Sequence, residues 1–163
     1  MHLKNHLMLS TANLFLFVQP LHGWRQVNVT AQRTKQDFAQ QMKLLVDVYF
    51  PDAEVIRLVV DNLNTHTPAA LYEALPPAEA RRITCKLEFH YTPKHGSWLN
   101  MAECELAVLT TQCLDQRIPD IETLRREVAA WQAKRNEQRT KINWRFGTDQ
   151  ARVKLKRLYP SVD

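Results

Sequence analysis

The segment from Val55 to Val60 (VIRLVV) is a short, nearly unbroken apolar run that ends directly at Asp61. A run of this length is typical of a strand covered on both faces in a parallel or mixed sheet. In open α/β sheets, loops converge at the carboxyl ends of the strands, and active sites form at that edge. The sequence therefore predicts an α/β fold and makes Asp61 a candidate site residue.

Periodicity places further elements around this strand. Residues 12–19 and 24–30 are rich in β-branched and aromatic residues and flank a turn at Pro20 and Gly23, which predicts a hairpin. Apolar residues at helical spacing predict helices after Thr34, from 68 to 75 with PPAEARRI as a candidate extension, from 98 with Ser97 as its cap, and from 119. Another strand is expected at 86–91. The predicted order is strand, strand, helix, strand, helix, strand, helix, helix.

Composition limits the class of protein. A chain of 163 residues with 45% hydrophobic residues suits one soluble domain. No run approaches the roughly 20 apolar residues that cross a bilayer, so we expect no membrane partner and a cytoplasmic location. The three cysteines, Cys85, Cys104 and Cys113, are odd in number and lack paired metal-ligand spacing, which argues against a disulfide framework and against a zinc site.

Positive charge is concentrated towards the C-terminus. Residues 1–120 carry 11 Lys and Arg against 12 Asp and Glu, whereas residues 121–163 carry 11 against 5. Such a concentration attracts a polyanion through its long-range field and through counterion release. A solvated helix face would have the same composition, and charge alone does not separate the two interpretations.

Two polar segments each contain an acid in a suggestive place. Asp61-Asn62 follows the apolar strand with His66 nearby, and Ser97-x-x-Asn100-x-x-Glu103 opens a predicted helix. A strand-end aspartate and a glutamate in the first turn of a later helix can converge on one point, and hard divalent cations prefer such carboxylates. Asp61 could instead be a turn former. Glu105 competes with Glu103 but lies on another face of the helix.

The histidines offer an alternative metal site. His66, His90 and His95 could suggest a cluster with Cys85, but their spacing matches no zinc pattern. We therefore expect His66 to orient the loop after Asp61. His95 and Lys94 are candidates for phosphate contacts.

These motifs carry a resemblance to a known family. The stretch DNLNTHTPAALYEAL…KLEFHYTPKHGSWLNMAE resembles bacterial insertion-sequence transposases of the mariner-related superfamily, which have a DDE (Asp-Asp-Glu) endonuclease domain. The similarity runs from about Thr11 to Pro160. It implies a ribonuclease-H-like mixed sheet flanked by helices, with Asp61 as the second and Glu103 as the third metal-binding carboxylate. It also implies two magnesium ions, for which manganese can substitute, and supporting roles for Asn62, His66 and Asn100.

The resemblance also implies that one part of the family pattern is missing. In the family the first catalytic aspartate lies on the first, central strand, upstream of the hairpin, and residues 1–10 contain no Asp or Glu. We therefore expect an N-terminally truncated chain. Residues 1–10 would be an unrelated or residual N-terminus, 11–118 an incomplete catalytic domain without its central strand, and 119–163 a basic helical C-terminal extension.

Three functions remain open. The chain could be a transposase catalytic domain for DNA cleavage and strand transfer, inactive alone unless a homo-oligomer or a complementing N-terminal transposase fragment supplies the missing acid. It could be a catalytically dead DNA-binding or subunit-poisoning fragment, or an unrelated α/β binding domain. The first two would act on DNA at the bacterial nucleoid. The candidate DNA contacts are Lys94, His95, Arg125, Arg126, Lys134, Arg135, Arg139 and Lys141.

Overall fold

A computed structural model describes residues 12–61, 63–92, 100–143, 147 and 153. Its elements alternate between strands and helices, as the sequence predicts, which makes the protein α/β. In chain order they are β1 (Asn13–Gln19), β2 (Trp24–Thr30), α1 (Lys35–Leu44), the π-helical turn η1 (Leu45–Tyr49), β3 (Ile56–Val60), α2 (Pro68–Ala74), α3 (Pro77–Lys86), β4 (Leu87–Tyr91), α4 (Met101–Leu109), the π-helical turn η3 (Thr110–Leu114) and α5 (Ile121–Glu137).

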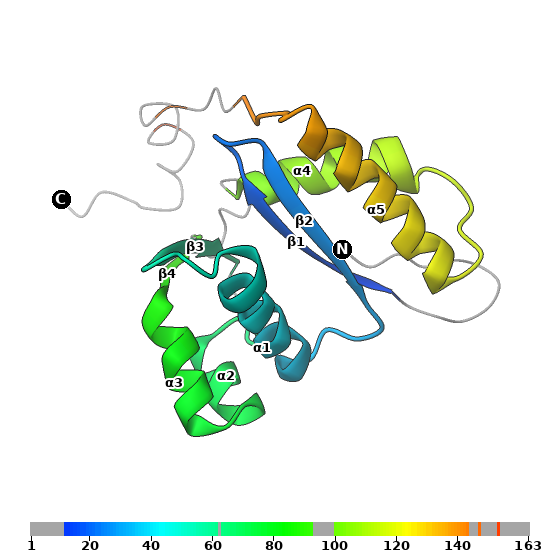
Figure 1. Cartoon of the computed structure of the whole chain (residues 1–163). Helices are drawn as coiled ribbons and strands as arrows, with labels where there is room; N and C mark the ends of the chain where they lie inside the picture. Colours follow the sequence, from blue (N-terminus) through cyan, green and yellow to red (C-terminus); the bar gives the residue numbers. More distant parts are fainter. Residues whose placement is uncertain (1–11, 62, 93–99, 144–146, 148–152, 154–163) are drawn as a thin grey trace.

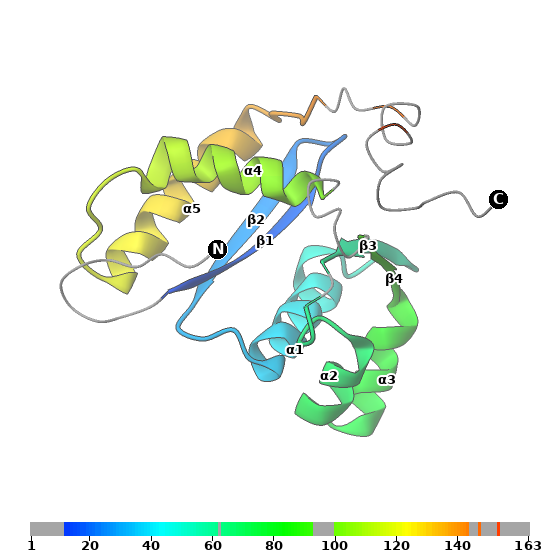
Figure 2. The same cartoon turned by 180° about the vertical axis from the view of Figure 1, so that it is seen from behind.

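The β1–β2 hairpin is covered on both faces. The strands pair antiparallel from Asn13 opposite Thr30 to Gln19 opposite Trp24. Because side chains alternate across a strand, Phe15 and Phe17 join one core with α1, whereas Leu14 and Leu16 join a second core with α4 and α5. Figures 1 and 2 show the hairpin between these two groups of helices.

The hairpin turn requires glycine at position 23. Gly23 has a φ of +69°, a conformation that residues with a Cβ rarely adopt. A Cβ there would also lie 2.3 Å from the carbonyl oxygen of Arg139, just beyond α5. The turn thus packs its backbone directly against the chain that follows α5.

The strands form two separate sheets in the described part of the chain. One contains β1 and β2, and the other contains β3 and β4, which run parallel with Ile56 opposite Leu87. The single mixed sheet expected from the resemblance is not present among these residues, because no described strand bridges β1 and β3. In the described residues, β1 pairs only with β2 and β3 pairs only with β4, so each of these two strands has one edge without a strand beside it.

The expectation that β3 is covered on both faces is wrong. Ile56 and Leu58 pack against the first core, but Arg57 is exposed and Val59 is 56% exposed. Helices cover only one side of this two-stranded sheet in the described residues, so the core buries only some of the apolar side chains of this run.

Two helix boundaries also differ from the sequence prediction. The cap of α4 is Asn100, whose side chain accepts a hydrogen bond of 3.0 Å from the backbone N–H of Ala102, so the helix starts later than a Ser97 cap requires. Ser97 itself lies outside the described residues. The segment PPAEARRI does not extend α2 but forms α3, because the extended backbone at Leu75 and Pro76 ends one helix before the next begins.

Two hydrophobic cores stabilise the fold. The first joins α1, η1, α2, α3 and Phe15, and the second joins the hairpin to α4, η3 and α5. Leu124, Val128 and Trp131 recur at helical spacing and form the buried stripe of α5. Among the described helices, none is both long enough and apolar enough to cross a membrane.

A buried ion-pair cluster connects the hairpin with α4 and α5. Glu105 is 1% exposed. Its Oε1 lies 2.8 Å from Nε of the fully buried Arg25 and accepts a 2.7 Å hydrogen bond from Nε of Arg135. Arg135 donates a second hydrogen bond, of 3.2 Å, to Glu105 Oε2. One carboxylate therefore links β2, α4 and α5.

We predict that Glu105→Gln lowers the free energy of unfolding by about 3–5 kcal/mol, because it leaves the buried Arg25 guanidinium without a counter-charge. Urea denaturation measures the effect. The control is Glu122→Gln, which removes an exposed glutamate beside Arg125 and should cost less than about 1 kcal/mol. Equal losses in the two variants would contradict a central role for Glu105.

Candidate functional site

Asp61 lies at the carboxyl end of β3, where the chain turns into the loop before α2. Its Oδ1 is 2.5 Å from Nδ1 of His66. The loop is closed by a 2.9 Å hydrogen bond from the backbone N–H of His66 to the carbonyl of Leu63. The carboxylate is 37% exposed, so a strand-end acid is both positioned by a histidine and open to solvent.

The His66 ring is held by aromatic residues from two other elements. It stacks on Phe38 of α1, with ring centroids 4.7 Å apart, and lies 6.2 Å from Phe15 of β1. The hydroxyl of Tyr91 donates a 3.2 Å hydrogen bond to the backbone carbonyl of His66. The two rings hold the imidazole and Tyr91 holds the backbone of the same residue, so the Nδ1 of His66 lies beside the Asp61 carboxylate.

The surroundings of Asp61 favour the charged form of its carboxyl group. Burial raises the pKa of Asp61, but the hydrogen bond and charge of His66 lower it, with smaller contributions from the Leu63 amide and from the charge of Arg33. The net effect is a pKa below the ordinary value of 3.8. Asp61 is therefore an anion at neutral pH, the state in which a carboxylate binds a divalent cation.

Glu103 occupies the first turn of α4. Its backbone N–H donates a 3.0 Å hydrogen bond to the carbonyl of Asn100, and its side chain is exposed. The competing acid Glu105 is committed to Arg25 and Arg135 in the interior. Of the two glutamates, Glu103 is the one whose carboxylate is open to a ligand.

Other sequence candidates are either not described by the structure or lie on other elements. Asn62, Lys94 and His95 lie outside the described residues. His90 contacts Glu88 on β4 at 2.7 Å, and Cys85 is exposed on α3. In the described portion, no group of three His, Cys, Asp or Glu side chains is arranged to hold a metal ion.

Sequence reasoning missed the residues that hold His66. Phe15 and Phe38 belong to the apolar periodicity of their own elements, and this assigns them to a core without identifying what they contact. Tyr91 ends β4, and parallel pairing places it opposite Val60, immediately before Asp61. The sequence predicts both strands, so a parallel pairing of β3 with β4 was the one signal that could have placed Tyr91 near Asp61.

The structure thus places one candidate acid at the end of a strand and the other in the first turn of a helix, in an α/β fold. Comparison with protein-family models identifies the family: the DDE superfamily endonuclease model matches residues 4–125. The chain belongs to this family. Separate comparisons with curated proteins and with solved structures found no match.

We predict that His66→Phe raises the pKa of Asp61 towards its ordinary value, because the stacked ring is retained while the Nδ1 contact is lost. Carboxyl ¹³C NMR titration measures this pKa directly. His90→Phe, which alters the exposed contact with Glu88, should leave Asp61 unchanged.

The direction of the Asp61 pKa shift also predicts how the stability of the protein depends on pH. A lowered folded-state pKa stabilises the protein above the unfolded value near 3.8, and this contribution disappears as the pH falls through the lower folded pKa. Urea denaturation at a series of pH values measures this effect. The difference in free energy of unfolding between the wild type and His66→Phe should become smaller as the pH falls through the folded-state pKa of Asp61. An unshifted Asp61 pKa in His66→Phe would contradict the positioning role.

Proposed function

We propose that this chain is the catalytic domain of a bacterial insertion-sequence transposase of the mariner-related group, acting in DNA cleavage and strand transfer. The observation that carries the proposal is the open, ionised Asp61 at the end of β3 in a member of the DDE superfamily endonucleases. Glu103 in the first turn of α4 is the other acid of this chain and corresponds to the third carboxylate of the family pattern. In this proposal the fold follows the ribonuclease-H-like plan, with α5 and the basic residues after it as an extension.

The donor chemistry fits a hard divalent cation. Asp61 and Glu103 supply carboxylate oxygens, which magnesium and manganese prefer. When bound, two such ions activate the attacking hydroxyl and stabilise the leaving oxygen of a phosphodiester. Asn62 and Asn100 are proposed supporting residues, the latter through its cap of α4.

The chain's own residues have distinct roles in this proposal. His66 holds the Asp61 carboxylate in its charged form and in one orientation, with its ring fixed by Phe38. Glu103 is presented to solvent by a helix whose position depends on Glu105. Residues that keep two carboxylates in place reduce the reorganisation needed when DNA and metal bind.

We further propose that a third carboxylate comes from another polypeptide, either a complementing transposase fragment or another subunit. The step rests on the resemblance, which places a first aspartate upstream of the hairpin, whereas residues 1–10 contain no Asp or Glu. The alternative function is a DNA-binding or subunit-poisoning fragment without catalysis. The two proposals differ in one outcome. If the chain is a catalytic domain, DNA cleavage appears when a complementing fragment is added, and if it is an inactive fragment, it does not.

We predict that the chain alone does not cleave DNA bearing the element's ends in magnesium or manganese, whereas adding a fragment that carries the first aspartate of the family pattern restores cleavage. Asp61→Asn and Glu103→Gln should each reduce the restored rate by at least about 100-fold, because each removes a charged metal ligand. Gel analysis of nicked and joined products measures the rate.

Matched variants control for folding and charge. Asp52→Asn and Glu122→Gln remove exposed acids elsewhere and should retain activity. Cleavage by the unsupplemented chain that is lost in Asp61→Asn would contradict the need for a third acid. Failure of every tested complementing fragment, together with intact DNA binding, would favour the inactive alternative.

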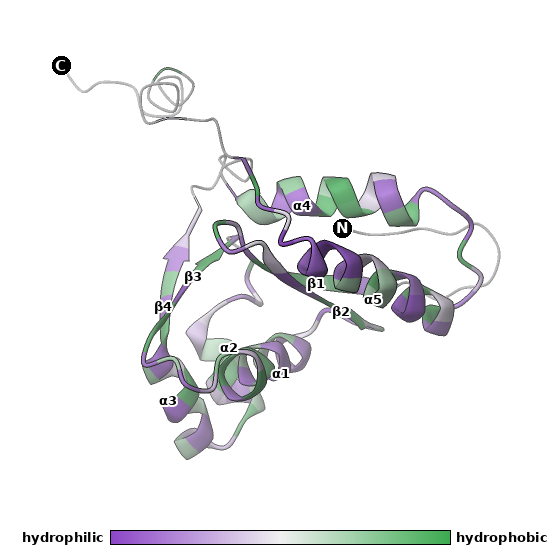
Figure 3. Cartoon of the chain, turned by 45° about the horizontal axis from the view of Figure 1, so that its top comes forward, coloured by the Kyte–Doolittle hydropathy of each residue, from purple (hydrophilic) through white to green (hydrophobic). Residues whose placement is uncertain are grey.

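Exposed basic residues provide a proposed DNA surface. Arg125, Arg126 and Lys134 lie on the solvent side of α5, and Arg139 and Lys141 follow it. Figure 3 shows hydrophilic residues along this helix. Arg135 differs, because its guanidinium is paired with Glu105 and lies over the Trp131 ring at 5.2 Å. The DNA proposal therefore rests on the other residues of this set.

We predict that duplex DNA binding weakens steeply with salt and shows little sequence preference. Replacing Arg126 and Lys134 together by glutamine should reduce the slope of log K against log salt by roughly 2, about one for each lost phosphate contact. Fluorescence anisotropy at several salt concentrations measures the slope. The control pair on α3, Arg81→Gln with Lys86→Gln, should leave it unchanged, and equal effects would contradict a DNA surface on α5.

A further inference from the structure

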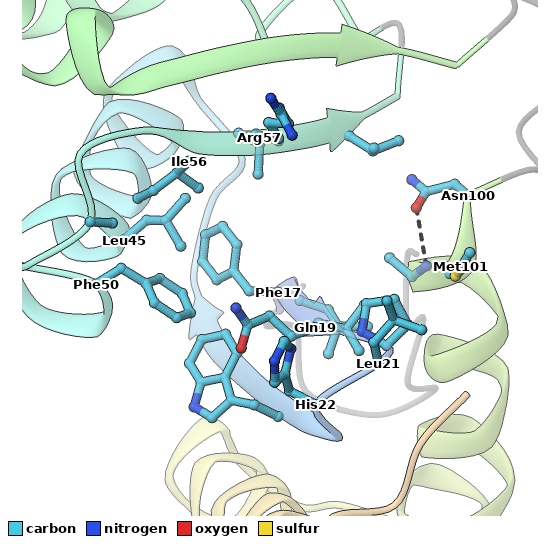
Figure 4. A pocket seen from close by; sticks show the side chains of 18 of the residues that line it. Phe17, Gln19, Leu21, His22, Leu45, Phe50, Ile56, Arg57, Asn100 and Met101 are labelled. Atoms are coloured by element: carbon cyan, nitrogen blue, oxygen red, sulfur yellow. Dashed lines mark hydrogen bonds between the residues drawn. The ribbon is translucent and has the colours of Figure 1, made fainter. Parts of the chain in front are cut away.

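The pocket between β3 and the start of α4 is poorly suited to a phosphate group. It has a volume of about 460 Å³ and reaches Val59, two residues before Asp61, and Met101, two residues before Glu103. Most of the labelled side chains that line it are apolar, as Figure 4 shows. The only arginine in its described lining, Arg57, already pairs with Glu88 on β4 at 3.2 Å. Moving a phosphate from water into such surroundings would be unfavourable.

Arg33 is a cation close to Asp61 that lies outside this pocket. It belongs to the short loop between β2 and α1, and it is exposed. Its positive charge is near enough to Asp61 to help lower the pKa of that carboxyl group. The ion pairs among the described residues engage other arginines, such as Arg57, Arg82 and Arg135, but not Arg33. Its guanidinium therefore keeps its hydrogen-bond donors for an anion from outside the chain.

Hydrogen bonds hold the loop on both sides of Arg33. Before it, the hydroxyl of Thr30 donates a 2.6 Å hydrogen bond to the carbonyl of Gln32. After it, Thr34 caps α1: the Thr34 side chain accepts a 3.2 Å hydrogen bond from the backbone N–H of Asp37, and the Asp37 carboxylate accepts one of 2.8 Å from the backbone N–H of Thr34. The backbone at Arg33 is thus fixed, although its side chain is open to solvent.

The helix that begins after Arg33 also supports Asp61. Phe38, in the first turn of α1, stacks on the His66 ring with centroids 4.7 Å apart, and His66 Nδ1 contacts the Asp61 carboxylate. The connection from the Arg33 loop to Asp61 therefore runs through one helical turn and one histidine. An arginine held in this way beside an acid is prepared for a ligand that must lie close to both, because little rearrangement is needed when the ligand binds.

We propose that Arg33 binds a DNA phosphate and holds the DNA backbone beside Asp61. The guanidinium donates a bidentate pair of hydrogen bonds to the phosphate oxygens, and its charge offsets the repulsion between the phosphate and the Asp61 carboxylate. The inference rests on the proposed function and deepens it, because it adds a contact at the acid to the DNA surface on α5. The two contacts belong to different parts of the fold, since α1 packs in the first core and α5 in the second.

The first test measures binding of a fluorescent DNA duplex to the full chain by anisotropy, in EDTA and without a complementing fragment. Arg33→Gln should weaken binding about fivefold and lower the slope of log K against log salt by about 1, as expected for one lost phosphate contact. Arg33→Lys keeps the charge and should retain the slope. The matched control is Arg81→Gln, which removes an exposed arginine on α3 and should change neither quantity. An unchanged slope in Arg33→Gln would overturn the proposal.

A double-variant cycle tests whether the bound phosphate lies beside Asp61. In EDTA, Asp61→Asn removes a negative charge facing the phosphate and should tighten DNA binding at least about threefold when Arg33 is present, but much less in Arg33→Gln. The control cycle pairs Arg33→Gln with Asp52→Asn, an exposed acid elsewhere, and should be additive. Additive effects of Arg33→Gln and Asp61→Asn would overturn the proposed position. Binding is measured apart from cleavage, so this proposal can fail while complementation restores cleavage, and it can hold while every fragment fails.

Discussion

The buried carboxylate of Glu105 is the constraint on which the arrangement of the second half of the chain depends. Charges removed from water are tolerated only when they are paired, and here one carboxylate pairs with Arg25 from β2 and Arg135 from α5. Asn136 strengthens the same junction by exchanging hydrogen bonds of 2.9 and 2.8 Å with the backbone of Arg25. The direction of α4 is set by this cluster, and Glu103 lies on the same helix two residues earlier.

Asp61 depends on a different set of contacts. Its position follows from the parallel pairing of β3 with β4, and its partner His66 is held by Phe38 and Phe15 in the first core. Phe15 lies on the hairpin, whose opposite face packs on α4 and α5. The hairpin is thus the physical connection between the packing that supports Asp61 and the packing that supports Glu103, so a change in either core can affect both acids.

Local sequence patterns predicted most elements but not their assembly. The hairpin, β3, β4 and the buried stripe of α5 each follow from periodicities of two or 3.6 residues, and Asp61 is a candidate site residue through its place after an apolar run. Glu105 could not be identified as buried, because a glutamate inside an amphipathic helix is usually exposed and its arginine partners are 80 and 30 residues away in the chain. The cap at Asn100 was missed because Ser97 is equally suitable by residue type.

The prediction that β3 is covered on both faces is wrong, and the reason is informative. An unbroken apolar strand indicates coverage on both faces, yet Val59 is exposed and lines the pocket that reaches α4. Sequence patterning records every surface that is buried when the protein works, including surfaces buried only in a complex, whereas the isolated chain shows only its internal contacts. The surplus of apolar side chains in VIRLVV concerns a face of β3, because side chains point to the faces of a sheet, and Arg57 and Val59 lie on the face that no described helix covers.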